Sequence, residues 1–247
     1  MRLDALSQAT RDLFEYAAGS PELAPFTLVG GSALALQIGH RRSMDLDFAV
    51  FTDTLPEPDI DRWIERLRQA GVAADDLTDI EAASRFRINT GKPLSRFARD
   101  YEIAGVRVTF FVQGRNEAQR RFYRDADVLH GSSRSFGILG LDGLKVAKTL
   151  VLADRARSRD LFDLMVLLRD HGLTVDRMAR IVRTLGHNND LEHYIAVMCG
   201  DIPLDAGDEG LHPTGTAIAI NDIHAELRRY IDAWQIERAS EAPWRHE

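Results

Sequence analysis

The spacing of apolar residues over the first 51 positions changes from that of a helix to that of a strand. Over residues 4–18 apolar side chains recur every three or four positions, which predicts an amphipathic helix. A short strand is expected over residues 26–29, and a second over 45–51, where apolar and polar residues alternate. The two faces of that second strand are Leu46, Phe48 and Val50 on one side and Asp45, Asp47 and Ala49 on the other.

A pair of glycines separates these two strands. Gly30-Gly31 turns the chain, and Ser32 is a candidate N-cap for a compact apolar helix over residues 33–38. The sequence therefore predicts a glycine turn at the head of a short helix, with a strand on either side.

The middle of the chain continues with a polar helix expected over residues 57–70. Strand-like alternation then returns between residues 84 and 112. It begins at Phe86 and Ile88 and continues as a hairpin over residues 97–103 and 106–112, joined by Ala104-Gly105.

After about residue 140 the spacing is helical throughout. The helices expected there span residues 141–153, 159–171, 175–185, 190–198 and 217–236. This order predicts an α/β (α+β) protein with two domains, an α/β core over residues 1–138 and a helical domain over residues 139–247 that completes a cleft.

Amino-acid composition changes none of the predicted helices and strands, but it excludes some classes of function. The 247 residues are 45% hydrophobic, and no run approaches the roughly 18 to 20 apolar residues that a membrane helix needs. The single cysteine, Cys199, excludes an internal disulfide or a thiolate cage for a metal. Because the first residues carry acids and do not resemble a signal peptide, we expect a cytoplasmic protein that does not contact membranes.

The net charge of −7 argues against binding nucleic acid over the whole surface. However, residues 85–134 carry eleven basic and five acidic side chains. This basic stretch is either a solvated face or a surface that binds phosphates.

The chemistry of the chain is concentrated around Asp45 and Asp47. Residues two apart on a strand face the same way, so these carboxylates should lie roughly 6 to 7 Å apart. Such a pair repels itself unless a cation lies between, and Mg²⁺ is commonly held by one or two carboxylates together with substrate phosphates. The N–H groups at a Gly-Gly helix start suit phosphate oxygens. The pattern therefore points to metal-dependent phosphoryl or nucleotidyl transfer.

The residue pattern of this stretch also resembles the signature of a known family. Gly30-Gly31-Ser32, twelve intervening residues and Asp45-Leu46-Asp47-Phe48, with Gly39-His40-Arg41-Arg42-Ser43 before the aspartates, resemble the signature of AbiEii-type nucleotidyltransferase toxins of type IV toxin–antitoxin systems. That family belongs to the DNA polymerase β-like nucleotidyltransferase superfamily. The resemblance implies a polymerase β-like core with a mixed sheet.

A second motif, in the helical part of the chain, also resembles this family. Lys148, Arg155 and the run Arg159-Asp160-Leu161-Phe162-Asp163 are similar to the family's helical motif. If one helix ran through them, Lys148, Arg155 and Arg159 would line a cationic stripe that could contact a triphosphate or a nucleic-acid backbone, with Asp160 and Asp163 orienting the cations. The alternative is a structural network of ion pairs between helices.

The resemblance implies transfer of a nucleoside monophosphate from an NTP to an acceptor hydroxyl, with Mg²⁺ as cofactor. RNA, including tRNA, or another cellular molecule would be the acceptor, and a cognate antitoxin would be a partner. The expected catalytic residues are Asp45, Asp47 and Lys148, of which the two aspartates hold the metal. The expected nucleotide-binding residues are Gly30, Gly31, Ser32, Arg42, Ser43, Arg155 and Asp160, and Arg41 is a further candidate for a phosphate contact.

One position departs from the superfamily pattern. A third carboxylate is expected on a neighbouring strand, and Thr109 stands where it should be. Glu102 or Asp100, across the hairpin, could substitute for it. Two alternative functions therefore stay open, a catalytically impaired module that binds nucleotides or proteins, and a small-molecule nucleotidyltransferase of the aminoglycoside-modifying kind.

Overall fold

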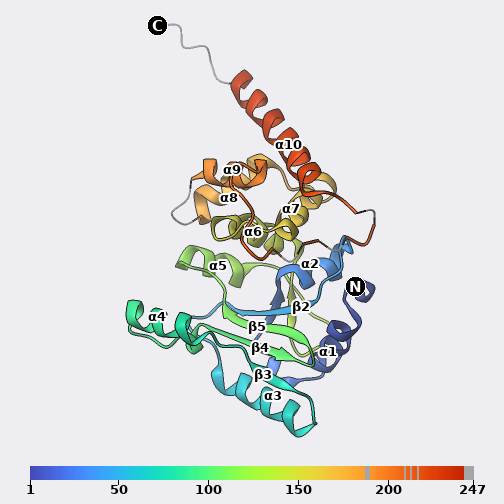
Figure 1. The fold of residues 1–247 in the computed structure, drawn as a ribbon, viewed down its shortest axis with the longest axis vertical. Helices are drawn as coiled ribbons and strands as arrows, with labels where there is room; N and C mark the ends of the chain where they lie inside the picture. The colour runs from blue at the N-terminus through green and yellow to red at the C-terminus, as the bar shows by residue number, and fades with distance from the viewer. Residues whose placement is uncertain (187–189, 209, 212, 216, 242–247) are drawn as a thin grey trace. The chain divides into compact units, whose positions relative to one another are not determined.

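The computed structural model describes residues 1–186, 190–208, 210–211, 213–215 and 217–241 (Figure 1). The chain divides into two compact units, Met1–Leu144 and Lys145–Glu247, and each has its own secondary structure. The first is mixed α/β and the described part of the second is helical, in the order that the sequence predicts.

A seven-stranded mixed sheet forms the first unit, in the order β3-β4-β5-β2-β1-β7-β6. The two strands that matter most, β2 and β5, lie side by side and parallel, whereas β4 pairs with β5 antiparallel through the predicted hairpin. The strands are β1 (Thr27–Val29), β2 (Asp45–Val50), β3 (Ala74–Asp76), β4 (Ala98–Ile103), β5 (Val106–Val112), β6 (Val128–Leu129) and β7 (Gly137–Leu139).

Five helices surround this sheet: α1 (Gln8–Ala18), α2 (Gly30–Ile38), α3 (Glu57–Gln69), α4 (Ile80–Thr90) and α5 (Glu117–Asp125). Side chains cap three of them, at N-cap residues of the types that capping favours. Ser7 accepts from the N–H of Thr10, Asp79 caps α4, and Asn116 accepts from the N–H of Gln119.

An aromatic cluster fills the buried face of the sheet. Phe48 and Phe110, neighbours on β2 and β5, stack with ring centroids 5.5 Å apart. Trp63 of α3 meets Phe110 edge-on at 5.8 Å, and its indole N–H donates to Ser20 Oγ at 3.0 Å. Because strand residues alternate between faces, burying Phe48 turns Asp47 to the other face of the sheet. The core thereby sets the direction of the two aspartates.

The chain segment before α1 is bonded to the segment before β2. Leu6 forms a parallel bridge with Ser43. The main-chain N–H of Ser43 donates to Ala5 at 2.9 Å, and that of Ser7 donates to the carbonyl of Ser43 at 3.0 Å. Ser43 is therefore fixed from the N-terminal side before the strand begins.

Two local predictions in this unit are wrong. Phe86 and Ile88 lie in helix α4, and not in a strand. The helix buries none of its residues, and Ile88 is 83% exposed, so no packing face reveals its period. Ser32 is not an N-cap, because α2 begins two residues earlier, at Gly30, with Val29 in the capping position. Helix α5 and the short strands β3, β6 and β7 were not predicted from the sequence.

The second unit contains α7 (Ser158–Asp170), α8 (Val175–Leu185), α9 (Leu191–Cys199) and α10 (Ile220–Glu241), and α6 (Leu141–Leu150) crosses into it from the first unit. The α10 helix is five residues longer at its C-terminal end than predicted. The continuous helix considered for the second motif does not form, because a 3-10 turn at Val151–Ala153 and a non-helical stretch precede α7. No helix in the described residues is long and apolar enough to span a bilayer.

Candidate active site

The site of the first unit is built on β2. Asp45 and Asp47 are both half-buried, and the residues that alternate with them, Leu46 and Phe48, are fully buried. The two carboxylates therefore share the face of the sheet opposite the aromatic core, as the strand pattern predicts. Carboxylates in this arrangement are the ligands that Mg²⁺ accepts in proteins.

Gly30 lies directly against Asp47. Its φ of +68° is in the left-handed region that favours glycine. A Cβ built on Gly30 would also collide with the Oδ2 of Asp47. Both the backbone and the space thus require glycine, and the first residue of α2 lies against a carboxylate of β2. The main-chain N–H groups of a helix N-terminus are in this way brought beside the aspartate pair.

The second glycine lies against a cation. A Cβ on Gly31 would meet the Nη2 atom of Arg41 and would come within 3.4 Å of Ser43 Oγ. Of the two arginines expected as phosphate contacts, Arg41 is only 5% exposed, whereas Arg42 is exposed. The guanidinium beside the glycine turn is thus that of Arg41.

The position of Arg41 follows from a signal that the sequence contains. Arg41, Ser43, Asp45 and Asp47 are spaced two apart, and the residues between the first three, Arg42 and Met44, are exposed. The two-residue spacing of Arg41 and Ser43 matches that of Asp45 and Asp47, and both Arg41 and Ser43 lie against Gly31.

Hydroxyl groups join the two halves of the site. The Ser32 hydroxyl is within hydrogen-bond distance of Ser43 Oγ, at 2.9 Å, and of the main-chain oxygen of Asp45. Ser43 Oγ in turn donates to Asp45 Oδ1 at 3.3 Å. Both serines are 1% exposed. Ser32 and Ser43 therefore hold the start of α2 against β2 and orient the first aspartate.

Two rows of polar residues extend from the aspartates across neighbouring strands. Asp47 is level with Thr109 on β5, and Thr109 is level with Asp100 on β4. The second row is Asp45, Arg107 and Glu102. The structure thus places Thr109 beside Asp47, and Asp100 and Glu102 on the same face one strand further.

Asp100 is the carboxylate that contacts Thr109. The Thr109 hydroxyl donates to Asp100 Oδ1 at 2.7 Å, and Arg107 Nη2 lies 3.4 Å from the same oxygen. The Asp100 side chain is 31% exposed. Glu102 lies level with Arg107 and is exposed.

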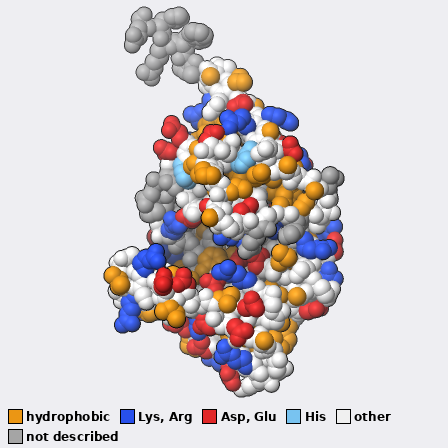
Figure 2. Space-filling view, viewed as in Figure 1, with side chains coloured by type: hydrophobic (Ala, Val, Ile, Leu, Met, Phe, Trp, Pro, Cys, Tyr) orange, Lys and Arg blue, Asp and Glu red, His pale blue; other side chains and the backbone are white. Residues whose placement is uncertain are grey.

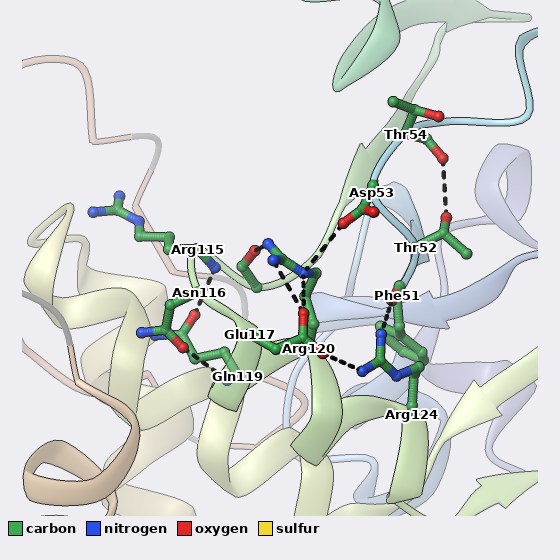
Figure 3. A network of polar contacts seen from close by, with 11 residues as sticks. Phe51, Thr52, Asp53, Thr54, Arg115, Asn116, Glu117, Gln119, Arg120 and Arg124 are labelled. Carbon is green, nitrogen blue, oxygen red and sulfur yellow. Dashed lines mark hydrogen bonds and ion pairs between the residues drawn. The ribbon is translucent and has the colours of Figure 1, made fainter.

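The end of β2 is fixed by α5 (Figure 3). Arg124 Nη1 donates to the carbonyl of Phe51 at 3.4 Å, and Arg120 lies between Glu117, at 3.2 Å, and Asp53, at 3.7 Å. These are cations of the basic stretch at residues 85–134. Their pairing with acids favours a solvated face at these residues. On the face of the molecule drawn in Figure 2, basic and acidic side chains are interspersed.

The second motif forms a buried ion cluster inside the second unit. Lys148 Nζ lies 2.7 Å from Asp160 Oδ1 and 2.6 Å from Asp163 Oδ2. Arg155 Nε lies 2.7 Å from Asp160 Oδ2. The break after α6 lets Lys148 and Arg155 converge on Asp160, so they do not line a stripe. The predicted orientation of the cations by Asp160 and Asp163 is present.

Asp160 is the electrostatic centre of this cluster. Its side chain is fully buried, and burial by itself raises a carboxyl pKa. The charges of Lys148 and Arg155 outweigh that effect and lower the pKa of Asp160 from 3.8 to about 2. Lys148 is 6% exposed, whereas Arg155 is 35% exposed and can reach solvent.

A divalent cation fits the chemistry of Asp45 and Asp47, since both carboxylates are hard oxygen donors on the same face of β2. Within the described residues no group of three or more histidine, cysteine, aspartate or glutamate side chains is placed to hold a metal.

The family follows from a match over most of the chain. The sequence model for the nucleotidyl transferase AbiEii toxin of type IV toxin–antitoxin systems matches residues 11–239. The chain belongs to the AbiEii family. The resemblance seen in the glycine pair and the Asp-Leu-Asp-Phe run is thereby confirmed.

Other similarities to this AbiEii protein are distant. An uncharacterised protein of Aquifex aeolicus (strain VF5), aq_aa25, is 27% identical over 167 residues, which are 67% of this chain and 68% of that protein. A crystal structure of a candidate nucleotidyltransferase from H. pylori has a TM-score of 0.50 at 18% identity and covers 98% of this chain and 99% of its own. MenT4, the nucleotidyltransferase toxin Rv2826c of Mycobacterium tuberculosis H37Rv, has a TM-score of 0.48 at 13% identity over 91% of this chain and 84% of its own.

The fold and the family together confirm the predicted fold class, a mixed α/β nucleotidyltransferase fold. They support the enzyme class of the AbiEii protein at the level of nucleotidyltransferase.

Proposed function

We propose that this AbiEii protein is a Mg²⁺-dependent nucleotidyltransferase that moves a nucleoside monophosphate from an NTP to an acceptor hydroxyl. The observation that carries the proposal is the contact between Gly30 and Asp47, which joins a helix N-terminus to a pair of carboxylates. A helix N-terminus binds phosphate oxygens, and a pair of carboxylates binds a divalent cation. An NTP bound to Mg²⁺ supplies both the phosphate oxygens and the cation.

The roles of the residues follow from their positions. Asp45 and Asp47 would hold Mg²⁺, which when bound would neutralise charge on the triphosphate. The main-chain N–H groups at Gly30, Gly31 and Ser32 would receive the β- and γ-phosphates, and Ser43 would keep Asp45 in place through its 3.3 Å bond. Of Arg41 and Arg42, we favour Arg41 as the phosphate contact, since its guanidinium lies at Gly31.

In the reaction the acceptor oxygen attacks the α-phosphorus, and pyrophosphate leaves with the bond that breaks. The chain's contribution is to position the triphosphate and to neutralise its charge, which provides most of the rate in such transfers.

Within the second unit, Arg155 is proposed to contact the nucleotide or the acceptor, and the buried Lys148 and Asp160 to hold it in place. The partial exposure of Arg155 and its bond to a buried, ionised Asp160 support this role. Lys148, held between Asp160 and Asp163, would position them, and its assignment as a catalytic residue comes from the family motif.

The family supports a biological role as the toxin of a type IV toxin–antitoxin pair, with an antitoxin as partner. RNA, and tRNA in particular, is the acceptor that we propose to test first.

The test incubates the protein with each labelled NTP, Mg²⁺ and total RNA, and follows label on RNA by gel. We expect transfer by the wild type and none by the Asp47→Asn variant. Asp12→Asn is the matched control, because this exposed residue lies on α1, outside the proposed site. Undiminished transfer by Asp47→Asn would exclude the assigned site.

The alternative of a catalytically impaired nucleotide-binding module has one observation in its favour, the threonine at the position of the third carboxylate. It predicts NTP binding by calorimetry without label transfer to any acceptor. A small-molecule nucleotidyltransferase would instead label an aminoglycoside and ignore RNA.

A further inference from the structure

We propose that Asp100 takes the place of the missing third carboxylate by acting through the hydroxyl of Thr109. The inference rests on the proposed function, because it assigns the group that receives the proton of the acceptor hydroxyl.

The register of three strands carries the first step. Asp47, Thr109 and Asp100 are level with one another on β2, β5 and β4, so their side chains leave the same face of the sheet. Adjacent strands lie about 4.8 Å apart, which puts the Asp100 backbone roughly 10 Å from that of Asp47. Thr109 stands between the two carboxylates.

The direction of the hydrogen bond carries the second step. A carboxylate only accepts, so the 2.7 Å contact fixes the Thr109 hydroxyl as the donor to Asp100 Oδ1. The lone pairs of Thr109 Oγ1 are then available to accept from another hydroxyl. A threonine alone is a poor base, but a threonine that already donates to a carboxylate can pass a proton on.

The burial pattern shows why Asp100 is favoured over Glu102. Both lie on the same face of β4, but Glu102 is level with Arg107, in the row of Asp45. Only Asp100 is level with Thr109, and Asp100 is half-buried whereas Glu102 is exposed.

The proposed step balances without a further reactant. As the acceptor oxygen forms its bond to the α-phosphorus, its proton passes to Thr109 Oγ1, and the proton of Thr109 passes to Asp100 Oδ1. The bond between the α-phosphorus and the bridging oxygen breaks, and pyrophosphate carries away that electron pair. Asp100 is therefore a positioning and proton-accepting residue that acts through Thr109.

The experiment compares kcat and KM for NTP in six variants. Asp100→Asn keeps an acceptor for the Thr109 hydroxyl but cannot take its proton, and Thr109→Val removes the hydroxyl at nearly constant shape. We expect each to lower kcat about 100-fold, in the range of a lost general base, with KM changed less than about threefold. Because both break the same path, the double variant should be no slower than either single one.

Three further variants separate this role from a structural one. Thr109→Ser keeps the hydroxyl and should retain kcat within about fivefold, since only the stiffness at χ1 is lost. Glu102→Gln, the matched control on the same strand and face, should retain wild-type kcat. Adding Thr109→Asp to Asp100→Asn moves the carboxylate one strand closer and should recover kcat about tenfold over Asp100→Asn alone.

Binding of a non-hydrolysable NTP with Mg²⁺, measured by calorimetry, separates the failure of this inference from that of the proposed function. Asp100→Asn and Thr109→Val should bind like the wild type, whereas Asp47→Asn should not. Wild-type kcat in Asp100→Asn, or a change in KM alone, would overturn the relay and leave the enzyme assignment standing. A wild type that neither binds NTP nor transfers label would overturn both.

Discussion

Gly30 has no room for a side chain because the carboxylate of Asp47 occupies the position that a Cβ would take. The first residue of a helix and a strand residue seventeen positions later are thus in direct contact. The proposed site depends on this contact. The effect of losing the contact can be measured separately from the effect of backbone strain.

Gly30→Ala should destabilise the protein and displace Asp47. Strain at φ +68° alone costs about 1–2 kcal/mol, and the collision with Asp47 adds to it. Gly71→Ala is the matched control, because its φ is +78° but nothing lies within 4 Å of its Cβ. Denaturant unfolding and NTP titration should show a loss of NTP binding in Gly30→Ala only. Equal behaviour of the two variants in both measurements would mean that the contact with Asp47 has no role.

Replacing Arg41 and replacing Arg42 should have very different effects on NTP binding, although the two residues are neighbours. Arg41→Ala removes a buried guanidinium at Gly31 and should weaken NTP binding by about 10- to 100-fold, as expected for a lost charge-assisted hydrogen bond. Arg42→Ala removes an exposed one and should weaken it less than about threefold. Calorimetric titration of both variants tests the assignment, and the reverse order would return the role to Arg42.

Much of this site could be predicted from local patterns. The alternation of Leu46 and Phe48 with Asp45 and Asp47 fixed the two faces of β2, and the Ala104-Gly105 hairpin was placed correctly. The sequence offered both Arg41 and Arg42 as phosphate contacts, but it could not show that the guanidinium at Gly31 is that of Arg41. A bond such as that between Thr109 and Asp100 depends on the register of two strands, which hydrophobic spacing leaves undetermined.

The errors have equally local causes. Helix α4 buries no residue, so its sequence needs no apolar stripe. The spacing of Phe86 and Ile88, two residues apart, is therefore like that of a strand. Helix α5 buries only Gln119 and Tyr123 and is otherwise polar. The break between α6 and α7 is not marked by glycine or proline, yet it brings Lys148 and Arg155 to one carboxylate.

Lys148→Met should destabilise the protein strongly, because Asp160 and Asp163 would be left buried with one fewer positive charge. Removing one partner of a buried ion pair costs about 3–5 kcal/mol. Arg169→Met breaks an exposed pair with Asp170 and should cost less than about 1 kcal/mol. The free energies of unfolding in urea give both values. A small effect of Lys148→Met on unfolding would argue against a structural role for the cluster.

Acid should weaken the fold through Asp160. Its pKa is about 2 in the folded protein, below the ordinary aspartate value of 3.8, so the unfolded chain binds the proton more readily. The resulting stabilisation, about 2 kcal/mol, is complete above pH 4 to 5 and is lost as the pH falls through 3.8 towards 2. Unfolding free energies between pH 6 and pH 2 should show a smaller dependence on pH in Asp160→Asn than in the wild type. Parallel curves for the two proteins would exclude this source of acid sensitivity.

The bonds from Ala5, Leu6 and Ser7 to Ser43 have a practical consequence for anyone who shortens this protein. A version that starts at α1 would keep every residue assigned to the site. It would still lose the main-chain hydrogen bonds that hold Ser43 from the N-terminal side. Asp45 would then be held less firmly, so a measurement of metal binding on such a version would not be a fair test of the proposed Mg²⁺ site.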